Sequence, residues 1–283
     1  MTRRAITRRV AMQTLATLGA NALLVAGPTP PTAHAQEQAP PAATATATGR
    51  ELRVLTFNIH HAEGTDGVLD VARIATLIRD TRADVVGLQE VDRGAERTAR
   101  RDLLKELADL TGMRLVFGKN IDLQGGDYGN ALLTSRPIVS EGNKLLPNTN
   151  GGEQRGVLQV VLDVAGTQVL VLTTHLDHRR EDQQRVASAD AIAAMVQAWG
   201  SGPVVAMGDF NDVPTSATHA RLAGVLTDVW ATVGQGNGFT IPVEAPNRRI
   251  DWILVRGFEA TRADVLTTNA SDHLPVVASI RLK

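Results

Sequence analysis

The chain of 283 residues contains no cysteine. Disulfide bonds, catalysis by a thiolate and zinc sites with cysteine ligands are therefore excluded, and the fold has to be stabilised by packing alone. The sequence also lacks a Gly-rich phosphate-binding loop, a serine nucleophile elbow and a His-Glu-x-x-His zinc helix. These absences remove the commonest competing hydrolase and nucleotide-binding chemistries.

Aromatic residues are scarce, at 3% of the chain, and Tyr128 is the only tyrosine. Proteins that bind single-stranded nucleic acid use aromatic rings for stacking, and proteins that bind duplexes use many lysines and arginines. The formal net charge is −1, and it falls to −5 without residues 1–35, because that segment has four arginines and no acidic residue. Nucleic acid is therefore a possible partner that the composition does not favour.

Residues 1–35 have the composition of an export signal. The arginine pairs Arg3–Arg4 and Arg8–Arg9 precede an apolar stretch, which is followed by Ala33–Ala35, a small-x-small cleavage site. The second pair resembles a twin-arginine signal, and a general secretory signal is the alternative. The apolar stretch is short for a membrane span. We therefore expect cleavage, no stable membrane span afterwards, and a bacterial protein of the periplasm or the extracellular space.

Residues 36–49 are rich in Ala, Thr, Pro and Gln, and this composition predicts a low-complexity linker. Residues 50–283 are long enough for one large domain. Apolar patterns predict strands at 51–58, 83–91, 114–118, 131–134, 156–164, 167–174, 203–207, 251–255 and 276–282. They predict helices after Asp70 and at about 98–111, 181–199 and 218–222. Interleaved helices and strands of this kind indicate an α/β fold with two packed sheets and helices outside.

The segment Met207–Pro214 has the clearest chemical character. An apolar strand ends there and is followed by Asp209 and Asn211, with Gly208 allowing a turn or a close approach and Pro214 stopping the segment. A carboxylate beside a carboxamide can bind a hard cation and orient a water for attack on a phosphate. The alternative is an Asx turn, in which the two side chains bond only their own backbone.

Other predicted strands also end in polar residues of the same kind. The full set is Asn58, Glu90, His175, Asp209 with Asn211, Asp251, and Asp272 with His273. Carboxylate and amide oxygens without thiols suit Mg²⁺, Mn²⁺ or Ca²⁺ better than a structural zinc ion. The set therefore favours a divalent-cation site.

The order and flanking residues of this set resemble the endonuclease/exonuclease/phosphatase superfamily, which includes deoxyribonucleases, apurinic endonucleases and neutral sphingomyelinases. The stretch Asn58–Gly67 looks most like a bacterial branch of metal-dependent hydrolases. Six segments carry the resemblance in the family's order, namely Thr56–Ile59, Leu88–Val91, Thr174–Leu176, Gly208–Asn211, Arg249–Trp252 and Ser271–Pro275. They span nearly all of residues 50–283, which the resemblance makes the catalytic domain.

The resemblance implies a four-layered α/β sandwich, with two facing mixed sheets flanked by helices and the site at one open edge. It also implies a metal held by Glu90 with Asn58 and Asp272 beside it. Asp209, positioned with Asn211, would orient or deprotonate the attacking water. His273, held in its tautomer by Asp251, would bond the phosphoryl oxygens. His175 would stabilise the transition state or protonate the leaving group.

Several neighbouring residues are predicted to contact the substrate. Relatives often contact the phosphate at the positions of Asn130 and Arg155, although Arg155 could equally be a solvated surface charge. Tyr128 could bond the substrate or anchor its loop, and Gln124–Asn130 is expected to be a flexible loop. His61 and His178 could extend the site. His60 is interpreted as a supporting or surface residue. The arginine pairs at 100–101, 179–180 and 248–249 are hypothesised to form a basic rim.

Together these features predict an exported phosphoric ester hydrolase that depends on Mg²⁺, Mn²⁺ or Ca²⁺ and acts as a monomer. We expect a phosphodiesterase in which water attacks in line, with a small molecule or a lipid head group as the favoured substrate. The alternative is a secreted nuclease acting on extracellular DNA or RNA. A binding module that lacks catalysis is a minor alternative, because every metal and acid position of the family pattern is filled.

Overall fold

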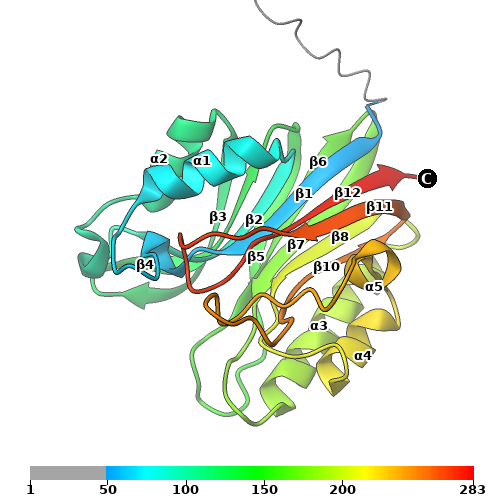
Figure 1. Ribbon diagram of the computed structural model, residues 1–283. Helices are drawn as coiled ribbons and strands as arrows, with labels where there is room; N and C mark the ends of the chain where they lie inside the picture. Colours follow the sequence, from blue (N-terminus) through cyan, green and yellow to red (C-terminus); the bar gives the residue numbers. More distant parts are fainter. Residues whose placement is uncertain (1–48) are drawn as a thin grey trace, which may run out of the picture. The chain divides into compact units, whose positions relative to one another are not determined.

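A computed structural model describes residues 49–283, so the predicted export signal and nearly all of the predicted linker lie outside the described residues. The described strands form two six-stranded sheets (Figure 1). In order across the first sheet they are β11 (Phe258–Val265), β12 (Val276–Leu282), β1 (Glu51–Asn58), β2 (Val85–Arg93), β4 (Gly126–Thr134) and β3 (Arg114–Leu123). In the second sheet they are β5 (Ile138–Leu145), β6 (Gly156–Val164), β7 (Thr167–His175), β8 (Val204–Asp209), β10 (Asp251–Arg256) and β9 (Thr227–Asp228).

The helices lie on the outer faces of the two sheets (Figure 1). Helices α1 (Val71–Thr81) and α2 (Leu103–Thr111) pack on the first sheet, and α3 (Gln183–Ala198) and α4 (Ala217–Ala223) pack on the second. The short helix α5 (Val229–Val233) lies beside β10 and β11. Asp70 caps α1 by accepting from the Arg73 backbone N–H, as its position before the apolar pattern predicts. Among residues 49–283, every helix is too short or too polar to cross a membrane.

Three apolar layers hold these four layers of secondary structure together, and the alternation of side chains along the strands creates them. On β1, Leu52 and Val54 point into the core between the two sheets, whereas Leu55 and Phe57 point toward α1 and α2. The third apolar layer joins the second sheet to α3 and α4 through residues such as Ile192 and Trp252. The predicted four-layered α/β sandwich is therefore confirmed.

The structure corrects several predicted elements. Residues 126–134 form β4, which pairs with β3, so the expected flexible loop at 124–130 is in fact mostly strand with a tight turn at Gln124–Gly125. Strands β5 and β11 were not predicted, because they are sheet edges whose exposed faces carry polar residues and show little apolar alternation. Helix α2 begins at Leu103 rather than near Thr98, after a separate 3₁₀ turn, Glu96–Thr98.

Strand pairing brings the polar strand ends together. In the second sheet Asp209 pairs with His175 on one side and with Asp251 on the other. In the first sheet the end of β1, Asn58, pairs with Gln89, the residue that precedes Glu90. The two sheets are joined at this end by a contact between Asn58 and Asp209. The residues at these strand ends, predicted to form a site, therefore lie close together at one edge of the sandwich.

Candidate active site

A cleft of about 360 Å³ opens at this edge of the sandwich. Its walls come from both sheets and from two loops. The lining residues are Glu90, Arg97, Ile121, Leu123, Tyr128, Glu153, Arg155, His175, His178, Asp209, Asn211 and His273. Most of the predicted site residues thus face one cavity, and the remaining ones lie behind or beside it as described below.

Asp209 is at the centre of the cleft and is 1% exposed. Its Oδ1 accepts from the backbone N–H of Asn211 at 2.9 Å, which is the Asx turn considered as the alternative to a functional role. Its Oδ2 accepts from the amide of Asn58 at 3.1 Å and lies 3.4 Å from His175 Nε2 and 3.7 Å from His273 Nε2. The turn and the site therefore use different oxygens of one carboxylate.

Gly208 lets β8 approach β7 closely. Its φ is 153°, and a Cβ atom there would lie 2.0 Å from the carbonyl oxygen of Thr174 on β7. The neighbour that requires glycine is thus the backbone of β7 rather than a ligand. As a result His175 and Asp209, at the ends of paired strands, lie side by side.

The pKa values of Asp209 and His273 are strongly shifted. Burial raises the pKa of Asp209 to about 7, with the neighbouring charge of Asp251 adding to the effect. Burial alone lowers the pKa of His273, but the carboxylates of Asp251 and Asp209 outweigh it and raise that pKa to about 10. His273 Nδ1 lies 2.9 Å from Asp251 Oδ2. His273 is therefore a cation beside a carboxylate whose basicity suits proton transfer near neutral pH.

His175 is electrically neutral by contrast. Burial, together with the nearby charge of Arg155, lowers its pKa well below the ordinary value. The amide nitrogen of Asn211 donates to the carbonyl of Leu176 and lies 3.0 Å from His175 Nε2. Nε2 accordingly accepts from Asn211, and the ring proton is assigned to Nδ1, which has no partner among the described residues. The neutral ring lines the cleft, but its Nδ1–H is buried.

Glu90 comes from an irregularity in β2. The pairing of β2 with β4 shifts register between Leu88 and Val91, and Glu90 has a left-handed φ of 59°. Asn58 donates to Glu90 Oε1 at 2.9 Å, while the Asn58 oxygen accepts from the backbone N–H of His60. In this arrangement Asn58 turns its amide nitrogen, rather than its oxygen, toward the two carboxylates.

The predicted metal residue Asp272 is exposed, and its Oδ1 accepts from Ser271. Two clusters of potential metal ligands occur among residues 49–283, and Asp272 belongs to neither. One consists of Asp209, Asp251 and His273. The other consists of Glu90 with His60 and His61. His60, which we interpreted as a supporting or surface residue, therefore stands beside Glu90.

Arg155 is 2% exposed, so the interpretation of it as a solvated surface charge is wrong. Its guanidinium lies 2.6 Å from Glu153 Oε1 and 3.2 Å from His178 Nδ1. Tyr128 also lines the cleft, with the guanidinium of Arg97 over its ring. Arg97 and Glu153 were not predicted, because each comes from a loop segment without a recognisable motif.

Asn130 is buried and donates to the carbonyl of Gly156, which ties β4 to β6 across the two sheets. It does not line the cleft. The hypothesised basic rim is also not formed by the arginine pairs. Arg101 is paired with Glu106, Arg179 with Asp177, and Arg249 with Asp228, and none of these arginines lines the cleft. The guanidinium groups that face the cleft belong to Arg97 and Arg155.

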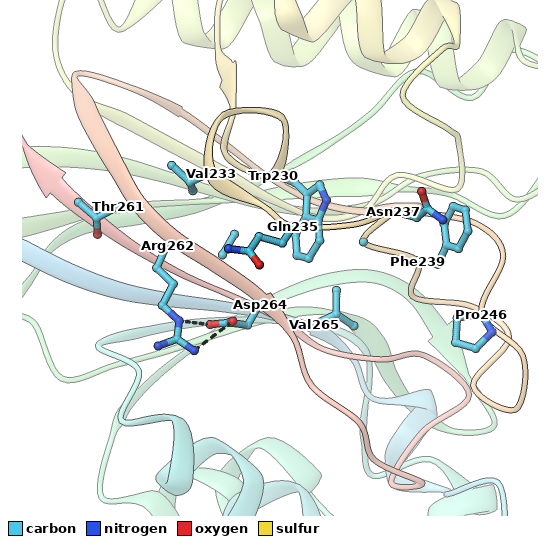
Figure 2. Close-up of a pocket in the computed structure, with 12 residues that line it drawn as sticks. Trp230, Val233, Gln235, Asn237, Phe239, Pro246, Thr261, Arg262, Asp264 and Val265 are labelled. Atoms are coloured by element: carbon cyan, nitrogen blue, oxygen red, sulfur yellow. Dashed lines mark hydrogen bonds and ion pairs between the residues drawn. The ribbon is translucent and has the colours of Figure 1, made fainter.

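A second cavity, of about 670 Å³, lies between α5, the loop that follows it and β11 (Figure 2). Trp230 and Phe239 contribute aromatic rings, and Arg262 is paired with Asp264 across its wall. None of the predicted site residues lines this larger cavity. The smaller cleft gathers the buried acids and histidines, and we therefore assign the candidate active site to it.

A model of the endonuclease/exonuclease/phosphatase family matches residues 55–273, a range that includes every residue lining the cleft. The chain belongs to this family. Members of the family are phosphoester hydrolases. The protein YbhP of Escherichia coli, described as uncharacterized, is 31% identical over 249 residues, which cover 81% of this chain and 96% of YbhP.

Three further proteins extend the comparison. A 5'-tyrosyl-DNA phosphodiesterase of Caenorhabditis elegans is 24% identical over 194 residues, covering 67% of this chain and 50% of that protein. A family member from Beutenbergia cavernae is 29% identical with a TM-score of 0.70, covering 82% of this chain and 72% of the other. A mannosyl-6-phosphatase from Bacteroides thetaiotaomicron is 22% identical with a TM-score of 0.69, covering 82% and 99%, and this likeness concerns the fold alone.

Proposed function

We propose that this family member is an exported, divalent-metal-dependent phosphoesterase that hydrolyses a phosphodiester by in-line attack of water. The observation that carries the proposal is the position of Asp209. Its Oδ2 faces Asn58, His175 and His273 in a cleft, and burial raises its pKa to about 7. A buried carboxylate of this basicity is suited to take a proton from water at neutral pH.

The side chains around Asp209 divide the remaining tasks. The imidazolium of His273, which Asp251 holds through Nδ1, bonds a phosphoryl oxygen and offsets its negative charge. Neutral His175 lines the cleft with Nε2 3.4 Å from Asp209 Oδ2, and from there it would stabilise the transition state or assist the leaving group. Asn211 fixes the orientation of the His175 ring through Nε2, and Arg155 adds a second fixed cation on the wall of the cleft.

The cleft also has donors that fit a divalent cation, because Glu90 and Asp209 are carboxylates in two separate ligand clusters. When bound, such a cation supplies charge neutralisation at the phosphoryl oxygens. Glu90 would hold it, with Asn58 orienting the Glu90 carboxylate through Oε1. The identity of the ion, Mg²⁺ or Mn²⁺ or Ca²⁺, is part of the proposal.

A small molecule or a lipid head group is the favoured substrate. The cleft of about 360 Å³ is near the lower end of the usual size for small-molecule sites. One arginine of each pair that would have formed a basic rim for nucleic acid is engaged with an acidic residue instead. The names of the relatives include a DNA-linked phosphodiester and a sugar phosphate monoester, so both ester types belong in the test.

The test is hydrolysis of bis(p-nitrophenyl) phosphate and of p-nitrophenyl phosphate with Mg²⁺, Mn²⁺, Ca²⁺ or a chelator. We expect metal-dependent hydrolysis of the diester, and a loss of roughly 100-fold or more in kcat for Asp209→Asn, as for removal of a general base. Asp190→Asn on α3 is the matched control, because Asp190 is exposed and distant from the cleft.

Two outcomes would count against the proposal. Unchanged kcat in Asp209→Asn would exclude Asp209 as the base. No hydrolysis of either ester by a folded protein with any of the three ions would favour a binding module. If bis(p-nitrophenyl) phosphate is cleaved, the hydrolysis of phospholipid, sugar phosphodiester and plasmid DNA is compared next.

Export is the part of the proposal that rests on residues 1–35, which lie outside the described structure. Replacing Arg8 and Arg9 together by lysine is expected to hold the precursor in the cytoplasm if the twin-arginine route is used. Unimpaired export of this variant, measured by fractionation and immunoblotting, would indicate the general secretory route.

A further inference from the structure

His60, His61 and Glu90 form a compact group on one side of the cleft. One nitrogen from each imidazole and one carboxylate oxygen lie within 4.8 Å of one another. Glu90 lines the cleft, and the histidines come from the 3₁₀ turn that directly follows β1. The group is separate from Asp209, Asp251 and His273, so the role of its two histidines is not explained by the chemistry proposed above.

His60 is oriented as a metal-ligating histidine usually is. Its Nδ1 lies 3.2 Å from the backbone carbonyl oxygen of Glu63. A carbonyl oxygen only accepts hydrogen bonds, so Nδ1 carries the proton and Nε2 keeps its lone pair. A carbonyl that fixes the ring and tautomer in this way is the usual partner of an imidazole that binds a metal through its other nitrogen.

His61 is 8% exposed, and its Nδ1 has no hydrogen-bond partner among the described residues. Its ring meets the ring of His60 edge to face, with 4.4 Å between the centroids. The nearest acid on the other side is Glu63, with 3.6 Å between Nε2 and Oε2. A buried imidazole nitrogen without a partner is unusual, and a ligand would satisfy it.

The backbone of all three residues is in the left-handed region of φ, which residues other than glycine rarely adopt. His60, His61 and Ala62 have φ values of 44°, 43° and 64°, and Glu90 has a φ of 59° in the bulge of β2. Each such residue costs about 1 kcal/mol or more, and strain of this kind collects at functional sites. Asn58 donates to Glu90 Oε1, which leaves Oε2 available as a ligand.

We propose that His60, His61 and Glu90 bind one divalent transition-metal ion through two imidazole nitrogens and one carboxylate oxygen. A set of two histidines and one carboxylate suits Zn²⁺, Co²⁺ or Mn²⁺, whereas Mg²⁺ and Ca²⁺ prefer oxygen ligands alone. The proposal rests on the proposed function for the use of this metal, and it narrows the ions named there, Mg²⁺, Mn²⁺ or Ca²⁺, to the transition-metal class. Asn58 then supports Glu90 instead of serving as a ligand.

The test is a titration of the purified full-length protein with Co²⁺, followed by visible absorption, with Mg²⁺ as competitor. We expect one Co²⁺ per chain, bound about 100-fold or more tightly than Mg²⁺, because imidazole ligands favour the transition metal. His60→Ala and His61→Ala should each weaken Co²⁺ binding by more than the roughly 10- to 100-fold that loss of a supporting residue costs. His219→Ala is the matched control, because His219 also bonds a carboxylate but lies on α4.

Unchanged Co²⁺ affinity in His60→Ala and His61→Ala would overturn the proposal, as would loss of binding in Asp209→Asn alone. Thermal unfolding monitored by circular dichroism checks that each variant folds. If His61→Ala does not fold, pulsed electron paramagnetic resonance of the Cu²⁺-loaded unaltered protein replaces it. Couplings to two imidazoles are expected there, and couplings to none would overturn the site. Tight Co²⁺ binding without ester hydrolysis leaves the site standing and removes only the proposed function.

Discussion

The hydroxyl of Thr240 donates to Oδ2 of Asp251 at 2.6 Å, and this is the same oxygen that lies 2.9 Å from Nδ1 of His273. Thr240 is fully buried. It precedes the Ile241–Arg248 segment, and its backbone carbonyl accepts from the N–H of Leu274, which follows His273. Thr240 thus fixes both the carboxylate that orients His273 and the loop that carries His273.

Thr240→Val removes this hydroxyl while keeping the shape of the side chain. We expect kcat for the diester to fall by about tenfold with little change in KM, because the loss of one hydrogen bond to a charged group costs about 1.5 kcal/mol. Steady-state kinetics measures the effect. Thr261→Val is the control, since the Thr261 hydroxyl bonds an exposed carbonyl at Ser279. Equal losses in the two variants would contradict a specific role for Thr240.

Arg155→Met tests the buried cation of the cleft. A hydrogen bond to a charged group is worth about 1.5–3 kcal/mol, so KM should rise by about 10- to 100-fold, with a smaller change in kcat. Arg180→Met serves as the comparison, because Arg180 is exposed and does not line the cleft. A KM equal to that of Arg180→Met would show that Arg155 only supports Glu153 and His178.

Gln89 connects the two sheets next to the site. It is buried, donates to the hydroxyl of Thr173 on β7 at 3.1 Å, and accepts from Thr56 on β1 at 3.4 Å. Gln89→Leu leaves both hydroxyls without this partner, which should lower the free energy of unfolding by about 2 kcal/mol. Urea unfolding measures the change. The exposed Gln168→Leu on β7 should alter stability by less than about 0.5 kcal/mol.

The buried ion pair of Asp228 should make stability depend on pH in acid. Burial alone raises the pKa of Asp228, but His219 and Arg249 outweigh it and lower that pKa to about 2. The pKa of Asp228 is lower in the folded state than in the unfolded state, so this carboxylate stabilises the fold fully when the pH is above its unfolded-state pKa. The stabilisation is lost as the pH falls through the folded-state pKa. From pH 5 to pH 2 we therefore expect a loss of about 2 kcal/mol from this group.

Unfolding of Asp228→Asn as a function of pH isolates this contribution. The difference in unfolding free energy between the variant and the unaltered protein should shrink as the pH falls from 5 to 2. Asp190→Asn, at an exposed position, should show no such trend. A difference that stays constant with pH would mean that the pair stabilises through packing rather than through the charge of Asp228.

Much of the fold could be read from local patterns. Apolar runs with period two predict strands because one face of each strand is buried, and Asp70 marks a helix start because its side chain bonds a free backbone N–H. The polar residues at the strand ends were found for the same reason, since a buried run that stops at a carboxylate marks the edge of the core. The edge strands β5 and β11 escaped because exposed strands have no such pattern.

The chemistry of individual residues depended on contacts between distant segments. Arg155 and Asn130 have nothing in their local sequence that shows whether they are buried, and residues 126–130 extend the predicted strand at 131–134 through pairing with β2 and β3. His60 approaches Glu90 because the backbone after β1 takes left-handed values at positions without glycine, which no propensity predicts.

The amino-acid sequence by itself determined the types of side chain at the strand ends, the absence of thiol chemistry and the resemblance that identified the family. The tertiary structure alone decided which of those side chains meet. Strand register places Asp209 between His175 and Asp251, and the packing of the two sheets brings Asn58 against both Glu90 and Asp209. Distances and pKa shifts arise from burial and from charges supplied by other segments, so they follow from the completed fold and not from any local stretch of the chain.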